Sequence, residues 1–504
     1  MKKSKLLIGM IVINLISMVL GFLRDTSIAY SLGATNLSDI FIFITNLPTI
    51  LFSAIGWVII STFVPVYTDV RLKSSEEETN KFANTFIKLI ILLALIMMII
   101  MYIFNKEAIT ILAPGFVEKD FELTKEMFFI ALPSFVLLTA SSCLCAILNS
   151  YKKMLWVSSI GIPVNIMIII GILFIYPLYG INVAVWMLIV ASIIQIIILV
   201  IPLRKTNFKF TLDFNLKDKN IIRIVGMIGP MIIGVMAQQI NMMFGGAITS
   251  TLNSGSLTSY NLANKVTNAA YNSIILIGIT FIFPYLSENY AKGRYDTFIK
   301  QIKNAVHIIL LVLIPISILL IVLNDNIISI LYGYGKFSPD DIKLTGEVLI
   351  FLSISIVGLG IRELVNRAYY ASNNTKIPMI FSILGIIINI IVSLVLVYKI
   401  GVIGVAIGNS ISIIISSCLI TRSFEKNNDI GSIINKKFII KYLFITIILF
   451  YSTKLINSYI NNFININLLN LILVSIISSI FYIILLYIFK IDIYKFTKSV
   501  FNKN

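Results

Sequence analysis

The sequence predicts an all-α protein that crosses a membrane many times, and three observations lead to this fold class. Of 504 residues, 58% are hydrophobic and only 12% are charged, whereas soluble domains carry about 25% charged residues. The hydrophobic residues are gathered in runs long enough to cross a bilayer, which takes roughly 20 helical residues. The basic residues fall mostly in alternate connections between these runs, as in an oriented membrane protein.

Fourteen apolar runs are separated by polar connections or by connections that contain Gly, Pro or Asn. The first run has no cleavage-site pattern, so we expect it to remain as a helix. The second is predicted to be one long helix that is broken near Pro48 or Pro65. The predicted spans are 6–32, 38–68, 82–104, 124–149, 155–176, 181–203, 221–247, 256–286, 300–323, 345–371, 378–398, 402–421, 438–456 and 467–489.

The orientation follows from the basic residues. With the N-terminus in the cytoplasm, 28 of the 40 Lys and Arg residues fall in cytoplasmic connections, seven fall outside and five lie within spans. This asymmetry follows the positive-inside rule and predicts that both termini are cytoplasmic. It also accounts for the net charge of +17, which we interpret as an attraction to anionic membrane lipids. Nucleic acid is therefore not expected as a partner.

Residues for catalysis or metal binding are scarce. Cys143, Cys145 and Cys418 lie in apolar segments without metal-ligand spacing, and the single histidine, His307, also lies in an apolar run. Metal catalysis and histidine acid–base chemistry therefore lack suitable groups. The sequence predicts no enzyme, no catalytic residue, no metal and no cofactor.

The first twelve spans contain an internal repeat with an offset of about 215–224 residues. Residues 63–67 at the end of the second span correspond to 281–285 at the end of the eighth, and 146–152 correspond to 368–374. Repeats of six spans keep the same orientation, so a pseudo-two-fold axis along the membrane normal should relate them, with a central cleft between. We predict an N-lobe (1–215), a C-lobe (216–430), and two additional helices with a cytoplasmic tail (431–504).

Charged residues inside the spans mark the candidate site, because each costs about 2.5–3.5 kcal/mol on insertion scales and needs a partner or a cavity. Arg24 and Asp25 lie in the first span, about two-thirds of the way toward the outer face. Asp39 begins the second span. It could stabilise the first turn of its own helix, or Asp39 or Asp25 could pair with Arg24.

The second lobe carries further cations. Lys265 lies about 13 Å down the eighth span and either faces Arg24 across the cleft or extends to the interface. Glu363 and Arg367 have i,i+4 spacing and can pair, whereas Arg362 points about 100° away. A structural ion pair is one interpretation. The other is a cavity with surplus positive charge, which suits an anionic ligand such as a pyrophosphate.

The first twelve spans contain a series of short distinctive segments. They are Gly21-Phe22-Leu23-Arg24-Asp25, Gly33-Ala34, Ser38-Asp39, Asn46-Leu47-Pro48, Phe63-Val64-Pro65, Ala113-Pro114-Gly115-Phe116, Ala146-Ile147-Leu148-Asn149, Tyr334-Gly335-Lys336-Phe337, Tyr369-Tyr370-Ala371 and Thr375-Lys376-Ile377-Pro378. In this order the segments resemble the MurJ/MviN family of lipid II flippases. The loops at 113–116 and 334–337 separate this family from drug-extruding relatives.

The resemblance implies membership of the multidrug/oligosaccharidyl-lipid/polysaccharide exporter superfamily. It implies alternating access of two lobes in a bacterial plasma membrane. It further implies that undecaprenyl-pyrophosphate-linked lipid II meets Arg24 and Lys265, with Arg362 engaged when the cleft opens inward. Cell-wall synthesis enzymes are further partners on this interpretation, and the last two spans are expected to hold the lipid tail.

The chain also departs from the family pattern. The family usually has basic residues at the positions that hold Met18 and Phe52-Ser53 here, and an acidic residue near the position of Trp57. These charged residues are missing from this chain. The seventh and eleventh spans offer Gln238, Gln239, Asn241 and Asn389 where some members place sodium among carboxylates. A flippase for another lipid-linked oligosaccharide is therefore the second hypothesis. A cation-coupled drug antiporter is the third hypothesis, and a membrane scaffold for cell-wall enzymes is the fourth.

Overall fold

A computed structural model describes residues 2–272, 277–372, 374–433, 436–463 and 466–491. Within these ranges the chain is helical and contains no strand, so the predicted all-α class is confirmed. The chain divides into two compact units, which we treat separately. The first is Met1–Thr258 with Tyr334–Phe337, and the second is Ser259–Gly333 with Ser338–Asn504.

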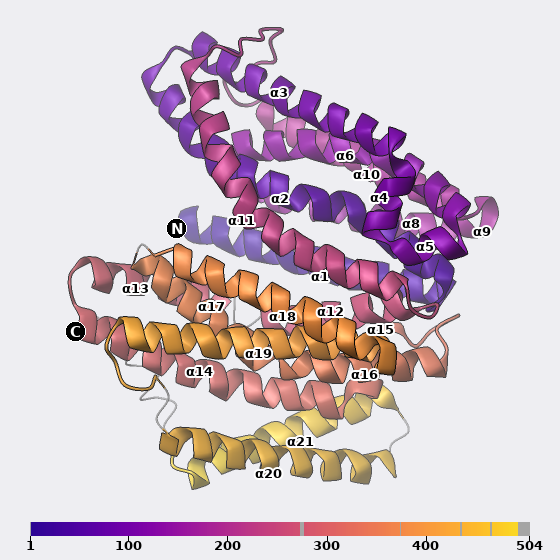
Figure 1. The fold of residues 1–504 in the computed structure, drawn as a ribbon, viewed down its shortest axis with the longest axis vertical. Helices are drawn as coiled ribbons and strands as arrows, with labels where there is room; N and C mark the ends of the chain where they lie inside the picture. Colours follow the sequence, from indigo (N-terminus) through magenta and orange to yellow (C-terminus); the bar gives the residue numbers. More distant parts are fainter. Residues whose placement is uncertain (1, 273–276, 373, 434–435, 464–465, 492–504) are drawn as a thin grey trace. The chain divides into compact units, whose positions relative to one another are not determined.

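The first unit contains long apolar helices joined by short ones (Figure 1). Its fifth span is interrupted by a π-helical turn. Its elements are α1 (Lys2–Leu32), α2 (Asn36–Lys73), α3 (Glu76–Ile103), α4 (Asn105–Leu112), α5 (Pro114–Lys119), α6 (Phe121–Ser150), α7 (Met154–Ser158), α8 (Gly161–Ile170), η1 (Gly171–Ile175), α9 (Tyr176–Tyr179), α10 (Ile181–Leu203) and α11 (Lys219–Ser250).

Helix α2 is the central element of the first unit. It packs against α6 and α11, and it contributes to two hydrophobic clusters, one around Phe41 and one around Phe63. In the second cluster the rings of Phe63 and Phe86 are stacked, with centroids 4.4 Å apart. The helix runs without interruption through Pro48 and Pro65. The predicted long helix is therefore confirmed, whereas the predicted break near a proline is not found.

A non-helical segment, 204–218, connects α10 to α11 and lies along α3. Polar side chains of α3 hydrogen-bond its backbone, which satisfies peptide groups that have no helical partner. These bonds join Asn80 to Asn207 and Lys209, Asn84 to Lys209, Thr85 to Asn215, and Lys88 to Asp213. At its end, the Asp218 carboxylate accepts from the N–H of Asn220 (2.7 Å) and caps α11.

The second unit begins within α12 and ends with a helical hairpin. Its elements are α12 (Ser256–Tyr271), α13 (Ile277–Ala291), α14 (Tyr295–Val322), α15 (Asn324–Tyr332), α16 (Pro339–Ile354), α17 (Ile356–Ala371), α18 (Lys376–Ile400), α19 (Val402–Asn427), α20 (Lys436–Asn461) and α21 (Asn467–Ile488).

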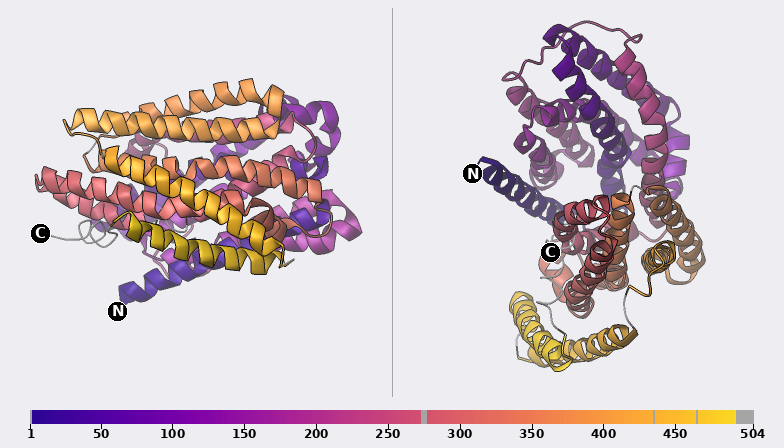
Figure 2. Two further views of the ribbon diagram at one scale, coloured as in Figure 1. Left: turned by 90° about the horizontal axis from the view of Figure 1, so that it is seen from below. Right: turned by 90° about the vertical axis from the view of Figure 1, so that its left-hand side faces the viewer.

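The helices α20 and α21 lie side by side and pack against α14 and α15 of the same unit (Figures 1 and 2). The Tyr482 hydroxyl donates to the Leu311 carbonyl of α14 (2.8 Å). His307 Nδ1 lies 3.2 Å from the Tyr442 hydroxyl, so the single histidine is a buried packing residue. The outer faces of both helices remain exposed and apolar, as expected of helices that contact lipid.

Eleven of the described helices are long and apolar enough to cross a membrane. The other three predicted spans, 38–68, 221–247 and 256–286, contain residues or side chains outside the described part. The total of fourteen therefore stays a prediction. The lobe boundaries at 215 and 430 also stay a prediction. They come from the repeat, whereas the units come from packing, which places α11 beside α2.

Candidate functional site

Arg24 and Asp25 of α1 form an ion pair with each other. The guanidinium of Arg24 donates from Nε (2.9 Å) and lies 2.8 Å through Nη2 from the same oxygen, Oδ1 of Asp25. The Asp25 side chain is buried, and that of Arg24 keeps 21% of its surface exposed. One of the sequence alternatives, pairing with Asp25, is therefore the arrangement found. Arginine has five N–H donors, so this contact leaves donors for a second anion.

Asp39 has partners on another helix. Its Oδ2 accepts from the N–H of Gly255 (2.8 Å), and its Oδ1 accepts from the N–H (2.7 Å) and the hydroxyl (2.6 Å) of Thr258. Only 2% of Asp39 is exposed. Gly255 immediately precedes α12 and Thr258 lies in its first turn, where backbone N–H groups have no helical carbonyl to accept from them. Asp39 therefore caps α12 while it stands in the first turn of α2, where the macrodipole also favours a carboxylate.

Local sequence fixes the position of Asp39. Thr35 and Ser38 form a capping box that starts α2. Ser38 Oγ then lies 2.9 Å from Thr258 Oγ1. Two neighbouring residues of α2 thus contact the same threonine of α12. Sequence reasoning missed Gly255 and Thr258, although the preceding Asn253-Ser254 is a typical turn signal.

Four glycines surround this contact, and we call Gly33, Gly115, Gly255 and Gly335 the glycine junction. At Gly255 a Cβ would lie 2.2 Å from the Ala34 carbonyl oxygen, and at Gly115 it would lie 1.9 Å from that of Ser250. Gly33, Gly255 and Gly335 also have φ between +64° and +84°, a region that favours glycine. Backbone meets backbone here, which no larger residue permits.

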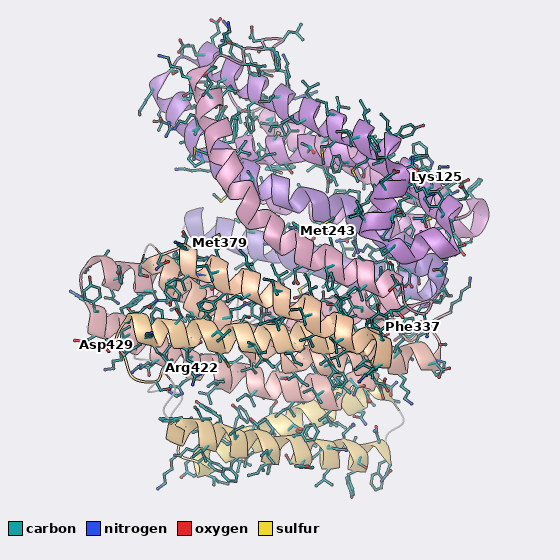
Figure 3. The ribbon with its side chains drawn as sticks, viewed as in Figure 1. Lys125, Met243, Phe337, Met379, Arg422 and Asp429 are labelled. Carbon is teal, nitrogen blue, oxygen red and sulfur yellow. The ribbon has the colours of Figure 1, made fainter. Side chains whose placement is uncertain are left out.

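The segment 334–337 completes the junction. The N–H of Lys336 donates to the Tyr30 carbonyl (2.9 Å), and a Cβ on Gly335 would lie 2.3 Å from that oxygen. Phe337, labelled in Figure 3, is buried at the end of the segment. Gly33, Gly115 and Gly335 lie in segments on which the family resemblance depends. The structure brings these separate segments together around α1 and α2.

In the second unit the predicted pair on α17 is present. Arg367 Nε lies 3.0 Å from Glu363 Oε1, and the guanidinium of Arg367 lies 5.7 Å from the ring centroid of Phe283. Arg362 turns away from that contact and donates from Nη1 to Ser416 Oγ of α19 (3.4 Å). The i,i+4 pairing and the separate direction of Arg362 are thus as predicted.

The remaining site candidate, Lys265, lies in the second unit, and several positions where the chain departs from the family pattern have side chains outside the described residues. Lys265 is half-buried on α12 in the second unit, and its opposition to Arg24 across a cleft stays a prediction. The side chains of Phe52, Ser53, Trp57 and Gln238 lie outside the described residues. Among the described residues no three His, Cys, Asp or Glu side chains are grouped to hold a metal ion.

Comparison with protein families gives a match over most of the chain. A family model described as "Lipid II flippase MurJ" matches residues 28–474. The chain is 27% identical over 427 residues to the probable lipid II flippase MurJ of Buchnera aphidicola, covering 84% of each chain. It is 27% identical over 408 residues to that of Rickettsia prowazekii, covering 79% of each chain.

Solved structures agree with this match. A lipid II flippase MurJ in an inward closed conformation superposes with a TM-score of 0.79 at 25% identity, covering 95% of this chain and 100% of that one. An inward-facing multidrug resistance MATE family transporter of the MOP superfamily gives a TM-score of 0.71 at 15% identity, covering 84% and 98%. The second similarity shows the fold alone.

Proposed function

The chain belongs to the lipid II flippase MurJ family, and we propose from this that it moves lipid II from the inner to the outer leaflet of a bacterial plasma membrane by alternating access. The similarity extends over nearly the whole chain and over the complete solved relative, and it carries this proposal. Such transport makes and breaks no covalent bond, so the residues have only to bind, release and change conformation.

The pyrophosphate of the substrate would contact the cations of the spans. Arg24, Lys265 and Arg362 are the proposed ligands, because a guanidinium holds phosphate oxygens through paired hydrogen bonds. Arg24 is already oriented by Asp25, and a fixed guanidinium loses little side-chain entropy on binding. Among the described residues Arg362 hydrogen-bonds Ser416 through a long contact of 3.4 Å, which it can exchange for a phosphate.

Asp39 and the glycine junction would form the gate at the end predicted to face outward. Three hydrogen bonds to one buried carboxylate support a closed state, since bonds to charged groups are worth about 1.5–3 kcal/mol each. Release of the lipid to the outer leaflet would require them to break. Alternating access then needs an equal compensating gain elsewhere, because a flippase cannot remain in one state.

The surroundings of the protein also enter the proposal. The distribution of basic residues supports cytoplasmic termini and a general attraction to anionic lipids of the inner leaflet. Enzymes that synthesise the cell wall would supply and consume the carried lipid and are proposed as partners on that chemical ground.

Complementation tests the function directly. A strain depleted of its own lipid II flippase should grow when this chain is expressed, and lipid II should be labelled at its outer surface. Arg24→Ala and Lys265→Ala should each abolish this, whereas Lys217→Asn, an exposed change outside the spans, should not. Growth without surface lipid II, or no rescue by a chain that reaches the membrane, would favour another lipid-linked oligosaccharide.

A further inference from the structure

A cavity lies where three spans of the first unit end. Helix α6 ends at Ser150, α10 ends at Leu203, and α7 begins the next span at Met154. The cavity has a volume of ≈ 290 Å³ and is lined by three lysines together with Trp156 and Ile201. Its position at the ends of spans places it at the level of lipid headgroups.

The lysines of this cavity have different environments. Lys153 is fixed, because its ammonium donates to the carbonyls of Pro202 (2.8 Å) and Lys205 (3.3 Å) at the end of α10, where the helix dipole favours a cation. Lys152 and Lys205 are exposed, and neither forms an ion pair with a carboxylate of the described chain. Two available cations therefore stand at the rim beside a fixed third one.

The backbone holds Lys152 in an unusual position. Its φ is +58°, the left-handed conformation that a helix end normally gives to Gly or Asn. The bonds from Lys152 N to Asn149 O and from Lys153 N to Leu148 O, both 2.9 Å, complete this turn. A lysine here carries strain that glycine or asparagine would avoid, and such strain often marks a functional position.

The other wall of the cavity suits acyl chains. Trp156 is 41% exposed and Ile201 48% exposed, which is usual for side chains that contact lipid near the headgroups, where Trp is enriched. A site that joins three cations to an apolar wall at this depth matches one ligand, a phospholipid whose phosphate meets the lysines and whose chains follow the wall.

We propose that this cavity, defined by Lys152, Lys153, Lys205, Trp156 and Ile201, is a binding site for an anionic phospholipid of the leaflet at the predicted cytoplasmic side. Helix ends α6, α7 and α10 meet in it, so a bound lipid joins three spans. The lining of the site includes none of the charged residues of α1 and α17, and it does not depend on which lipid-linked glycan is carried.

Fluorescence quenching tests the site, because the chain has only three tryptophans. In a Trp57→Phe, Trp186→Phe background, Trp156 is the single reporter. The full chain is placed in phosphatidylcholine vesicles that contain brominated phosphatidylglycerol or brominated phosphatidylcholine. We expect a preference for the anionic lipid of about fivefold per available lysine, hence up to roughly thirtyfold, which weakens with added salt.

Matched variants separate a site from general surface charge. Lys152→Asn with Lys205→Gln should reduce the preference to near onefold, since asparagine tolerates the left-handed backbone. Lys217→Asn with Lys300→Gln removes two other exposed charges and should leave it unchanged. Equal quenching by both lipids, retention in the first variant, equal loss in the second, or displacement by inorganic phosphate would each overturn the proposal.

A second measurement remains possible if the Trp57→Phe, Trp186→Phe variant fails to fold. Native mass spectrometry of the chain with all three tryptophans counts phosphatidylglycerol molecules that survive detergent removal. We expect one tightly bound molecule fewer in the Lys152→Asn, Lys205→Gln variant and the unchanged number in the Lys217→Asn, Lys300→Gln control. The same number in all three proteins would contradict the site.

Discussion

The predicted site residues of the first unit comprise one cation, Arg24, and two carboxylates, Asp25 and Asp39, whereas those of the second unit comprise three cations and the single carboxylate Glu363. In the first unit both carboxylates are buried, one against Arg24 and one against the start of α12. In the second unit Glu363 pairs with Arg367, and Arg362 contacts only a hydroxyl among its described hydrogen bonds.

This difference suggests a division of labour between the units. The buried carboxylates Asp25 and Asp39 are satisfied within the first unit, so they stabilise one conformation and offer nothing to an anionic ligand. Cations with donors to spare attract an anion but stabilise no particular state. We therefore expect substitutions of Asp39 and of the glycine junction to act mainly on the conformational equilibrium, and substitutions of Arg362, like those of Arg24, to act mainly on ligand affinity.

The largest effect should come from Gly255→Ala. A side chain there meets the Ala34 carbonyl at 2.2 Å and adopts φ +84°, so the closed junction should lose at least about 2 kcal/mol, or roughly thirtyfold in population. Hydrogen exchange of residues 253–260 should accelerate, and complementation should fail. Gly180→Ala is the control, because Gly180 has the same φ with nothing within 4 Å. Equal effects of both would show that strain alone, not the junction, is responsible.

Asp39→Asn should have the next largest effect. The amide keeps the shape, but its NH2 group takes the place of one oxygen and cannot accept from a backbone N–H such as that of Gly255. The bonds that its remaining oxygen keeps with Thr258 become neutral, which for these bonds is a loss of about 1–2 kcal/mol. Exchange of the Thr258 amide should therefore rise about five- to thirtyfold. Asp341→Asn removes a carboxylate that caps only its own helix, α16, and should leave residues 253–260 unchanged. An unchanged exchange rate of the Thr258 amide in Asp39→Asn would show that Asp39 does not stabilise the proposed gate.

Arg362→Gln sharpens the other side of the comparison. Loss of a charged donor should weaken binding of an undecaprenyl-pyrophosphate lipid about tenfold, measured by titration in native mass spectrometry, with exchange at 253–260 unaltered. Glu363→Gln, one residue away, removes a negative charge near the same site and should bind at least as tightly. Weaker binding in both variants would point to a disturbed α17 instead of a phosphate contact.

The smallest effect concerns the stability contributed by the α17 pair. Glu363 and Arg367 are 26% and 35% exposed, so Glu363→Gln should lower the free energy of unfolding by less than about 1 kcal/mol. Denaturant titration in detergent can compare it with Glu77→Gln, which breaks the exposed i,i+4 pair with Lys81 and should cost less, because both side chains of that pair are screened by solvent. A loss of several kcal/mol at Glu363 would make the pair a structural element of the second unit.

Contacts close in sequence were predictable from spacing alone. The Glu363–Arg367 pair follows from helical periodicity. The uninterrupted helix α2, which contains two prolines, was not predictable from local sequence. A proline inside a helix normally breaks or kinks it, but neighbouring helices stabilise this one. Packing against α6 and α11 decides that conformation, and a single sequence does not reveal it.

Contacts distant in sequence were beyond such reasoning. Asp39 hydrogen-bonds Gly255 and Thr258, which are more than 200 residues away. The sequence did not point to these partners, because the position of Asp39 in the first turn of its own helix was already a sufficient reason for a carboxylate there. The resemblance did select Gly33, Gly115 and Gly335 as parts of motifs. It did not indicate that they meet, because backbone approach leaves no periodic pattern in the sequence.

The attachment of segment 204–218 to α3 has a mechanical consequence. A freely jointed tether would let α11 drift, but here the segment is fixed along α3 and ends at the Asp218 cap. Helix α11 has 32 residues and is therefore about 48 Å long, and its first turn is held by Asp218. A rotation of about 10° at this turn carries the far tip, beside Ser250 and Gly115, through roughly 8 Å. A small rotation at one end of α11 would therefore give a large displacement at its other end.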